Sequence, residues 1–308
     1  MTDIVGKRFW FFVAAGAIIL FCIISLGHFG LKSGIELSSG SLLTVNFEQV
    51  VNEDELKQEL ANLGYGGAIV QRTGEGDFII RTSELGSQAK TQLEEGLTTR
   101  FGQVTEAEFY SVSPMVASET ARNAGIAIGV AAVGILLYIT WAFRKMPSPF
   151  RYGTCAIIAL GHDALVALGI FSVLGGILGW EINLMFITGI LAVVGYSVNN
   201  TVVVFDRIRE NLLRGISSDF ETVVNRSLVE TLSRSLNTSL TTLFVVLALL
   251  FFVGATIQNF AVVLLIGIVA GTFSSICIAP NLLIVWEKGG WHQLFKRTPK
   301  PAINTDRQ

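Results

Sequence analysis

The chain has 308 residues, of which 51% are hydrophobic and only 15% are charged, and its mean hydropathy is +0.58. This composition excludes an ordinary soluble domain and predicts a protein that crosses a membrane several times. The net charge of -2 excludes nothing, so the useful information is where the charges lie along the chain.

Six apolar runs are long enough to cross a bilayer, which takes about 20 residues of helix. The first run is longer than the apolar part of a signal peptide, and no small-x-small cleavage site follows it, so we expect it to remain as an anchor. The predicted core of the fold is therefore an all-α membrane bundle. The runs lie at residues 9–29, 123–143, 152–174, 182–205, 235–254 and 259–286.

Lys and Arg flank these runs at alternate ends, which places the basic flanks on one side of the membrane. The short loops near 175–181 and 254–258 contain neither residue. By the positive-inside rule, we expect a multi-pass protein of the cytoplasmic (inner) membrane with both termini cytoplasmic and residues 30–121 facing outward. The basic flanks are Lys7 and Arg8, then Arg144, Lys145 and Arg151, then Arg207, Arg209, Arg214 and Arg226, then Lys288, Lys296, Arg297 and Lys300.

The outward segment 30–121 reads as a small α+β domain. Strands are predicted at 41–47, 67–72, 77–82 and 104–112. Asn52 and Glu55 form a capping box that opens a helix to about Leu63, and a second helix is predicted over Ser87–Phe101. The order βαββαβ predicts a ferredoxin-like extracytoplasmic domain.

The expected domains are 1–29 (cytoplasmic N-terminus and first span), 30–121 (extracytoplasmic domain), 122–287 (spans two to six) and 288–308 (cytoplasmic basic tail). Within the third of these, residues 206–233 are polar with apolar residues at spacings of three and four. We expect this amphipathic segment to lie along the inner membrane face or against the bundle.

Polar side chains inside the apolar runs are the candidate functional residues, because in hydrocarbon they need a partner helix or a wet cavity. Asp163 lies about eleven residues, or on the order of 16 Å, from the basic flank at Arg151. It could carry protons there. Alternatively, Asp163 and His162 hydrogen-bond to neighbouring helices, Asn200 included, and hold the bundle together. Asn199 and Asn200 are expected to bond between helices or to line a hydrated path.

Two further groups lie nearer the membrane surface. Arg234 opens the fifth span, where it either pairs with an acceptor in the bundle or serves as an ordinary basic flank. At the inner end of the fourth span, a solvated and salt-bridged charged collar is predicted, with a contribution to gating left open. The collar consists of Asp206, Arg207, Arg209 and Glu210.

Small residues suggest close packing in the last span, where Gly267 and Gly271 form a GxxxG pattern, and Pro280 is expected to kink the span or end its regular part. The three cysteines, Cys22, Cys155 and Cys277, lie in apolar runs without metal-ligand spacing. They are predicted to be buried packing residues. No metal site, cofactor, catalytic residue or nucleic-acid partner is expected.

Taken together, these residues carry a family likeness. The chain resembles the SecF proteins of the SecD/SecF family, within the resistance-nodulation-division superfamily of transporters. The likeness covers nearly the whole chain, and its most specific part is Val-Val-Phe-Asp-Arg-Ile-Arg-Glu-Asn at residues 203–211, followed by the motif around Arg234. The other matching segments are residues 34–41, 112–116, 162–163, 231–236 and 265–275.

The resemblance implies a non-enzymatic accessory subunit of the Sec translocase. Such a subunit would work with a SecD-like partner and the SecYEG channel, in contact with membrane lipid, and would use the proton motive force to help export unfolded secretory polypeptides. Two alternatives remain open. The chain could be a structural subunit that stabilises the translocase without passing protons or, third, a proton-driven exporter of small molecules.

The chain departs from the family pattern at one informative position. The family usually has Ser-x-Asn-Asp in the fourth span, whereas this chain has Ser197-Val-Asn-Asn200. An amide does not titrate, so the proton role that the resemblance implies does not transfer to position 200. The outer motif also differs, with Glu36, Ser38 and Ser39 where the family commonly has Asp and a Thr-Gly-Gly run.

Overall fold

The computed structural model describes residues 3–72, 76–252, 257–287 and 289, and the chain divides into two compact units. The helical unit comprises Met1–Lys32, Ile128–Trp180 and Met185–Gln308, and the sheet unit comprises Ser33–Ala127 and Glu181–Leu184. The predicted basic tail 288–308 falls almost wholly outside the described residues.

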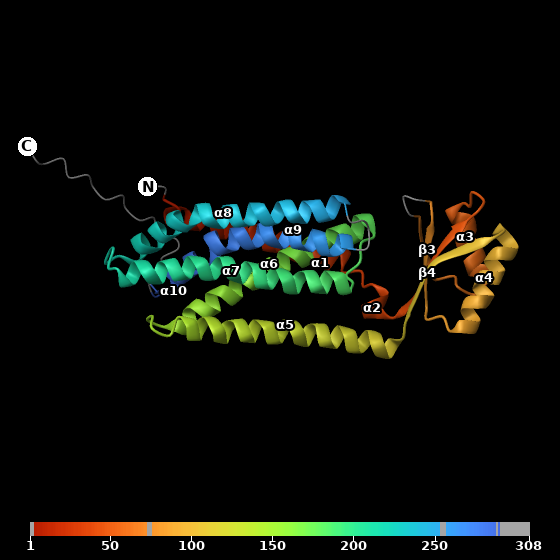
Figure 1. Ribbon diagram of the computed structural model, residues 1–308, viewed down its shortest axis with the longest axis horizontal. Helices are drawn as coiled ribbons and strands as arrows, with labels where there is room; N and C mark the ends of the chain where they lie inside the picture. Colours follow the sequence, from red (N-terminus) through yellow and green to blue (C-terminus); the bar gives the residue numbers. More distant parts are fainter. Residues whose placement is uncertain (1–2, 73–75, 253–256, 288, 290–308) are drawn as a thin grey trace, which may run out of the picture. The chain divides into compact units, whose positions relative to one another are not determined.

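Six helices of the described chain are long and apolar enough to cross a membrane, which confirms the predicted fold class (Figure 1). A short 3-10 turn, η1 (Val5–Lys7), leads into α1 (Arg8–Phe29). The next four are α5 (Pro114–Ala142), α6 (Pro149–Leu178), α7 (Leu184–Leu213) and α8 (Phe220–Phe252). The last comprises α9 (Gln258–Phe273), the π-helical turn η3 (Ser274–Ile278) and α10 (Ala279–Glu287).

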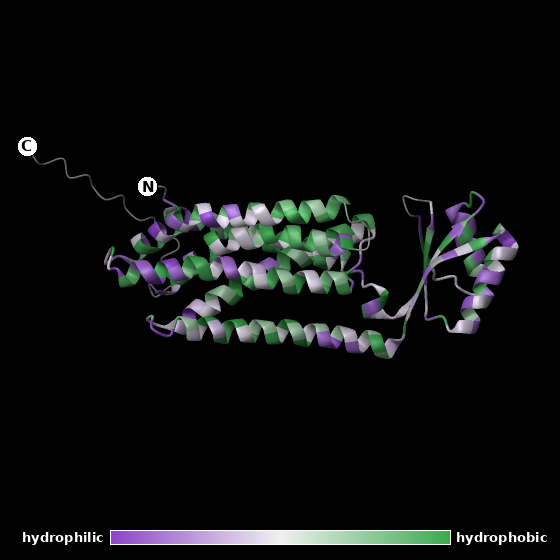
Figure 2. Cartoon of the chain, in the orientation of Figure 1, coloured by the Kyte–Doolittle hydropathy of each residue, from purple (hydrophilic) through white to green (hydrophobic). Residues whose placement is uncertain are grey.

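The predicted amphipathic segment 206–233 is not a separate element. Its residues form the C-terminal end of α7 and the N-terminal end of α8, which are joined by the turn at 214–219. Val224 and Leu228 are fully buried beside Phe205 and Ile208, because the apolar spacing of three and four continues the core stripe of both helices beyond the apolar span. Of the two predicted placements, the structure has the one against the bundle. Figure 2 shows the change along α8 from a mixed polar first half to an apolar second half.

The irregularity expected from Pro280 takes the form of the π-helical turn before it. The regular α-helix ends at Phe273, and the backbone N–H of Ala279 bonds to the carbonyl of Ser274. Proline has no N–H and its ring crowds the preceding turn, so a wider turn at this place relieves the conflict.

The core of the helical unit lies where α6, α7, α8 and the last span meet. About 67% of the apolar window of the last span and 50% of that of α6 are buried, against 6% for α5. Cys22, Cys155 and Cys277 are all free and buried, as predicted. The faces of α1 and α5 that remain exposed are strongly apolar, as expected of surfaces that meet lipid or another protein.

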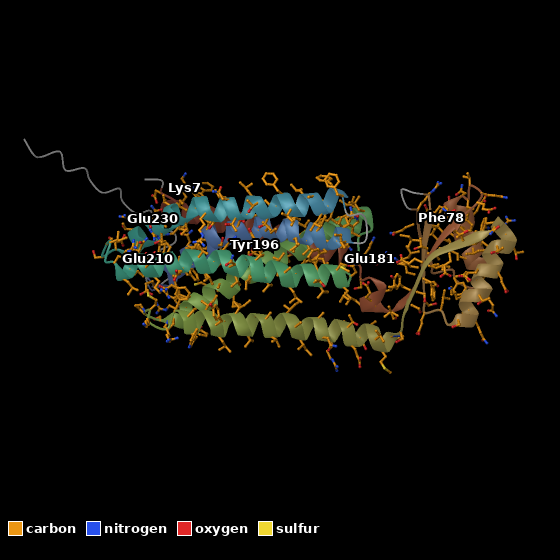
Figure 3. All side chains as sticks on the ribbon, viewed as in Figure 1. Lys7, Phe78, Glu181, Tyr196, Glu210 and Glu230 are labelled. Carbon is orange, nitrogen blue, oxygen red and sulfur yellow. The ribbon has the colours of Figure 1, made fainter. Side chains whose placement is uncertain are left out.

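The sheet unit confirms the predicted ferredoxin-like order. Its antiparallel strands are β1 (Gly40–Phe47), β2 (Ile69–Arg72), β3 (Phe78–Thr82) and β4 (Val104–Val112), in the spatial order β2-β3-β1-β4. Leu43 pairs with Ile80 on one side and Phe109 on the other. Two helices, α3 (Glu53–Asn62) and α4 (Ser87–Phe101), cover one face, and Phe78 points into the core between the layers (Figure 3).

A short helix that the sequence did not predict, α2 (Ile35–Ser38), precedes β1. Together with β3 it holds the segment 181–184 in the sheet unit. The N–H of Gly34 donates to the carbonyl of Ile182 at 2.9 Å, and Glu36 Oε2 accepts from the N–H of Leu184 at 3.1 Å. Arg81 also forms an ion pair with Glu181. Burial lowers the pKa of the Arg81 guanidinium, and the charge of Glu36 opposes that shift.

Candidate functional site

A buried carboxylate lies at the centre of the helical unit. Asp163, on α6, is 1% exposed. Its Oδ2 accepts hydrogen bonds from Ser197 Oγ at 2.6 Å and from Ser274 Oγ at 2.8 Å. On the other side, His162 Nδ1 lies 3.1 Å from Asp163 Oδ1. We call these four residues the Asp163 cluster.

Three separate elements meet at this cluster, since Ser197 comes from α7 and Ser274 opens the π-helical turn η3. The predicted GxxxG pattern explains how they come so close. A Cβ added to Gly271 would lie 2.9 Å from the Cβ of Ser197, and one added to Gly267 would overlap Val193. The absence of these two side chains lets the last span reach α7 and places Ser274 beside the carboxylate.

The electrostatics of the cluster follow from its burial. A carboxylate removed from water is costly unless it is hydrogen-bonded or takes up a proton. Here two hydroxyls and one imidazole nitrogen surround it. His162 is itself 5% exposed, and its Nε2 has no hydrogen-bond partner among the described residues. The cluster therefore places a hydrogen-bonded carboxylate beside an imidazole inside the helical unit.

The structure brings His162 and Asp163 together with Ser197 rather than with Asn200, so the expected bond between Asp163 and Asn200 is absent from the described contacts. Asn200 is 3% exposed, and its Nδ2 finds no partner among the described residues. Ser197 lies three residues earlier on the same helix and occupies the position facing Asp163. Asn199 is exposed on another face of α7.

Arg234 is exposed on α8. Within the described part of the chain, its guanidinium forms neither an ion pair nor a hydrogen bond. The first of the two predicted placements, paired with an acceptor in the bundle, therefore has no described contact in its favour. Arg234 does not belong to the Asp163 cluster.

The charged collar is a network of ion pairs at one end of the helical unit, the end at which Figure 3 labels Glu210, Glu230 and Lys7. Arg207 bonds to Glu210 at 2.6 Å and to Glu230 at 2.7 Å, and Asp206 bonds to Arg209 at 2.7 Å. The buried Asn211 also donates to Glu230 at 2.8 Å. Sequence reasoning missed Glu230, because only the hairpin of α7 and α8 brings it to the collar.

A second polar chain runs beside the Asp163 cluster and was also missed. Tyr196, midway along α7 in Figure 3, donates to Ser239 Oγ at 3.0 Å. Ser239 Oγ lies 2.6 Å from Thr272 Oγ1, which joins α8 to α9. Serine and threonine are common in membrane helices because they can bond to their own backbone. The sequence therefore did not indicate that Ser239, Thr272 or Ser274 bonds to another helix.

The fold and this site define a multi-span membrane protein with a buried polar cluster and a ferredoxin-like domain. Residues 92–289 match the family described as "Protein export membrane protein SecD/SecF, C-terminal". The protein translocase subunit SecF of Thermobaculum terrenum is 45% identical over 99% of this chain and 100% of its own length. That of Anaerolinea thermophila is 41% identical over 98% of this chain and 99% of its own. The chain belongs to the SecF subunits of the SecD/SecF family of protein export membrane proteins.

A solved structure supports the same assignment at the level of the fold. The crystal structure of SecDF from Thermus thermophilus, described as a translocon-associated membrane protein, matches with a TM-score of 0.81 at 31% identity. The match covers 93% of this chain and 39% of that one, so this chain spans about two fifths of the SecDF chain. A second SecDF structure, in a super-membrane-facing form, matches with a TM-score of 0.65.

Proposed function

We propose that this chain is an accessory subunit of the Sec translocase. In this role it assists the export of unfolded secretory proteins across the cytoplasmic membrane, works with a SecD-like partner and the SecYEG channel, and uses the proton motive force. Both termini would be cytoplasmic, and the sheet unit would face outward, where it meets the emerging polypeptide.

The need for a partner is supported by size and by Arg234. The part that matches this chain makes up only 38% of one relative named SecDF and 39% of another. Six spans with one ferredoxin-like domain amount to half of a pseudo-symmetric transporter. An Arg234 guanidinium that is exposed on a membrane helix would be covered by another chain or by water.

The observation that best supports proton coupling is the burial of Asp163 among the polar groups of His162, Ser197 and Ser274. Position 200 holds an amide, so a proton cannot be bound there. Asp163 and His162 are the buried groups of the cluster that can exchange one. In this proposal the proton passes through Asp163, and its arrival changes the hydrogen bonds that join α6 to α7 and to η3.

A second function, the uncoupled structural subunit, is favoured by the same Asn200. If the proton path of the family needs an acid at this position, the chain as it stands would stabilise the translocase without passing protons. The small-molecule exporter has no specific observation in its favour.

The test is gradient-dependent translocation of a secretory precursor into vesicles that contain the chain, its SecD-like partner and the channel. Three chains are compared: the unaltered sequence, Asp163→Asn and Asn200→Asp. The matched control is Asp3→Asn, which removes an exposed carboxylate outside the cluster and the collar. Equal incorporation of every variant is verified before translocation is measured.

Coupling through Asp163 requires that the unaltered chain respond to the gradient, that Asp163→Asn abolish the response and that Asp3→Asn retain it. If only Asn200→Asp responds, the uncoupled subunit is the correct function. If Asp163→Asn responds like the unaltered chain, the proton does not pass through Asp163.

A further inference from the structure

The π-helical turn η3 is the least regular segment of the spans, and its first residue touches the Asp163 carboxylate. All five of its residues are buried. The Ser274 hydroxyl donates to Asp163 Oδ2, while the neighbouring Ser275 hydroxyl donates to the carbonyl of Thr272 at 3.1 Å. The Ser274 hydroxyl also lies 3.3 Å from the carbonyl of Gly271, farther than the carboxylate. Of the two hydroxyls of the turn, only that of Ser274 therefore contacts the carboxylate.

A π-helical turn is less favourable than the α-helix and persists where surrounding contacts compensate for it. The bond from Ser274 is such a contact, and its strength depends on the charge of its acceptor. Hydrogen bonds to an ionised carboxylate are roughly twice as strong as those between neutral groups. A proton on Asp163 therefore weakens the contact that holds the turn.

We propose that Ser274 is a positioning residue for Asp163 and that the turn η3 responds to the charge of this carboxylate. While Asp163 is charged, Ser274 holds the turn in its wide form. When Asp163 gains a proton, this hold weakens and the turn loosens around Cys277, while Pro280 still prevents a regular α-helix through this segment. This inference rests on the proposed proton role of Asp163 and names the element that the proton would move.

His162 and Asp163 are the titratable side chains of the cluster, and of these two Asp163 is the one that accepts the hydrogen bond from Ser274 in the turn. The described residues of α9 contain no titratable side chain, and η3 contains only Cys277. On α10, Glu287 pairs with Arg151. No charged side chain of α1 or α7 forms a described ion pair with Asp163. The titratable groups of those two helices are Arg8, Cys22, His28, Tyr196, Asp206, Arg207, Arg209 and Glu210.

Cys277 gives the turn a native reporter, since it lies within η3 and is 9% exposed. In a full-length chain with Cys22→Ala and Cys155→Ala, it is the only thiol. The rate of its reaction with N-ethylmaleimide is measured in lipid nanodiscs at one fixed pH. This background is compared with the same chain carrying Ser274→Ala, Asp163→Asn or Ser275→Ala, and the monodispersity of each is verified by gel filtration.

We expect Ser274→Ala and Asp163→Asn each to accelerate labelling about tenfold, the factor expected when one hydrogen bond to a charged group is lost. Ser275→Ala is the matched control and should label at the background rate, because its hydroxyl does not touch Asp163. If Ser274→Ala does not fold, Asp163→Asn tests the same hydrogen bond by changing its acceptor.

The proposal is overturned if Asp163→Asn leaves the labelling rate unchanged, or if Ser275→Ala accelerates it as much as Ser274→Ala does. Labelling needs neither a gradient nor a translocation partner. A turn that responds to Asp163 in a chain that shows no gradient-dependent translocation would therefore sustain this inference and refute only the proposed coupling.

Discussion

The hydroxyl of Ser197 donates a 2.6 Å hydrogen bond to Oδ2 of Asp163 and so joins α7 to α6 inside the bundle. Because both groups are buried, Ser197→Ala would leave the carboxylate with one donor fewer. We expect this change to destabilise the helical unit by about 1.5–3 kcal/mol, the usual worth of a hydrogen bond to a charged group. Thermal unfolding in detergent measures it.

Asn200→Ala is the matched control for Ser197→Ala, since it removes a buried polar side chain from the same helix. The Asn200 Nδ2 has no partner among the described residues, so its loss should be nearly neutral or stabilising. A larger loss of stability for Asn200→Ala than for Ser197→Ala would contradict the assignment of the interhelical bond to Ser197.

A second prediction concerns the contact of α1 with α6. A Cβ added to Gly169 would overlap the side chain of Cys22, and Gly169 also accepts a hydrogen bond from Ser25 at 3.2 Å. Gly169→Ala should therefore separate the two helices and cost about 1–3 kcal/mol by overpacking. Gly161→Ala on the same helix meets no atom within 4 Å and serves as the control. Equal unfolding temperatures for the two variants would refute the close contact.

A third prediction concerns the segment before α1, whose backbone is bound to α8 by the side-chain amide of Asn225. Asn225 Oδ1 accepts from the N–H groups of Ile4 at 2.8 Å and Val5 at 3.1 Å, and Arg8 forms an ion pair with Glu221 nearby. Asn225→Ala leaves two backbone donors without this acceptor and should weaken the attachment by about 1–2 kcal/mol. Hydrogen exchange of residues 3–8 should accelerate, whereas Asn237→Ala, on an exposed face of α8, should leave it unchanged.

A fourth prediction concerns the pH dependence of the sheet unit. Burial, together with a hydrogen bond to Glu106, raises the pKa of Glu94 above its ordinary value of 4.5. The folded state therefore binds this proton more tightly than the unfolded state, and stability contributed by the neutral form is lost as the pH rises through the raised pKa. Glu94→Gln should remove that loss and gain at most about 0.5 kcal/mol at neutral pH, because the side chain is partly exposed.

Hydrogen exchange of β1 and β4, corrected for the intrinsic rate at each pH, measures the effect of Glu94→Gln. Glu95→Gln removes the same charge from the next position of α4 and is the control. If the difference between Glu94→Gln and the unaltered chain is the same at pH 4 and pH 7, the raised pKa of Glu94 is not the cause.

Much of the fold could be predicted because its signals are local. Each span can be recognised by a run of about 20 apolar residues. The strands and helices of the sheet unit can be predicted from turn residues and from the spacing of apolar residues over short stretches of sequence. The end of the regular helix before Pro280 was also foreseeable. The π form of that turn was not, because it depends on contacts with other helices.

The candidate site was predictable only in part, for a related reason. Asp163 and His162 are conspicuous in an apolar run, but Ser274 is not, since hydroxyls are common in membrane helices. Asn200 appeared to be the partner of Asp163 because it is the stronger hydrogen-bonding group. The side of α7 that faces α6 instead presents Ser197, and that choice depends on the rotation of one helix against another, which no local pattern specifies.

The position of Ser274 in the last span has a consequence for how the protein is made. Asp163 precedes Ser274 by 111 residues, so on the ribosome the third span is complete long before the sixth exists. Throughout that interval the carboxylate lacks one of its two hydroxyl donors, and for the first part of it Ser197 is also missing. The carboxylate of Asp163 therefore acquires its full set of hydrogen bonds only when the last span takes its place in the bundle.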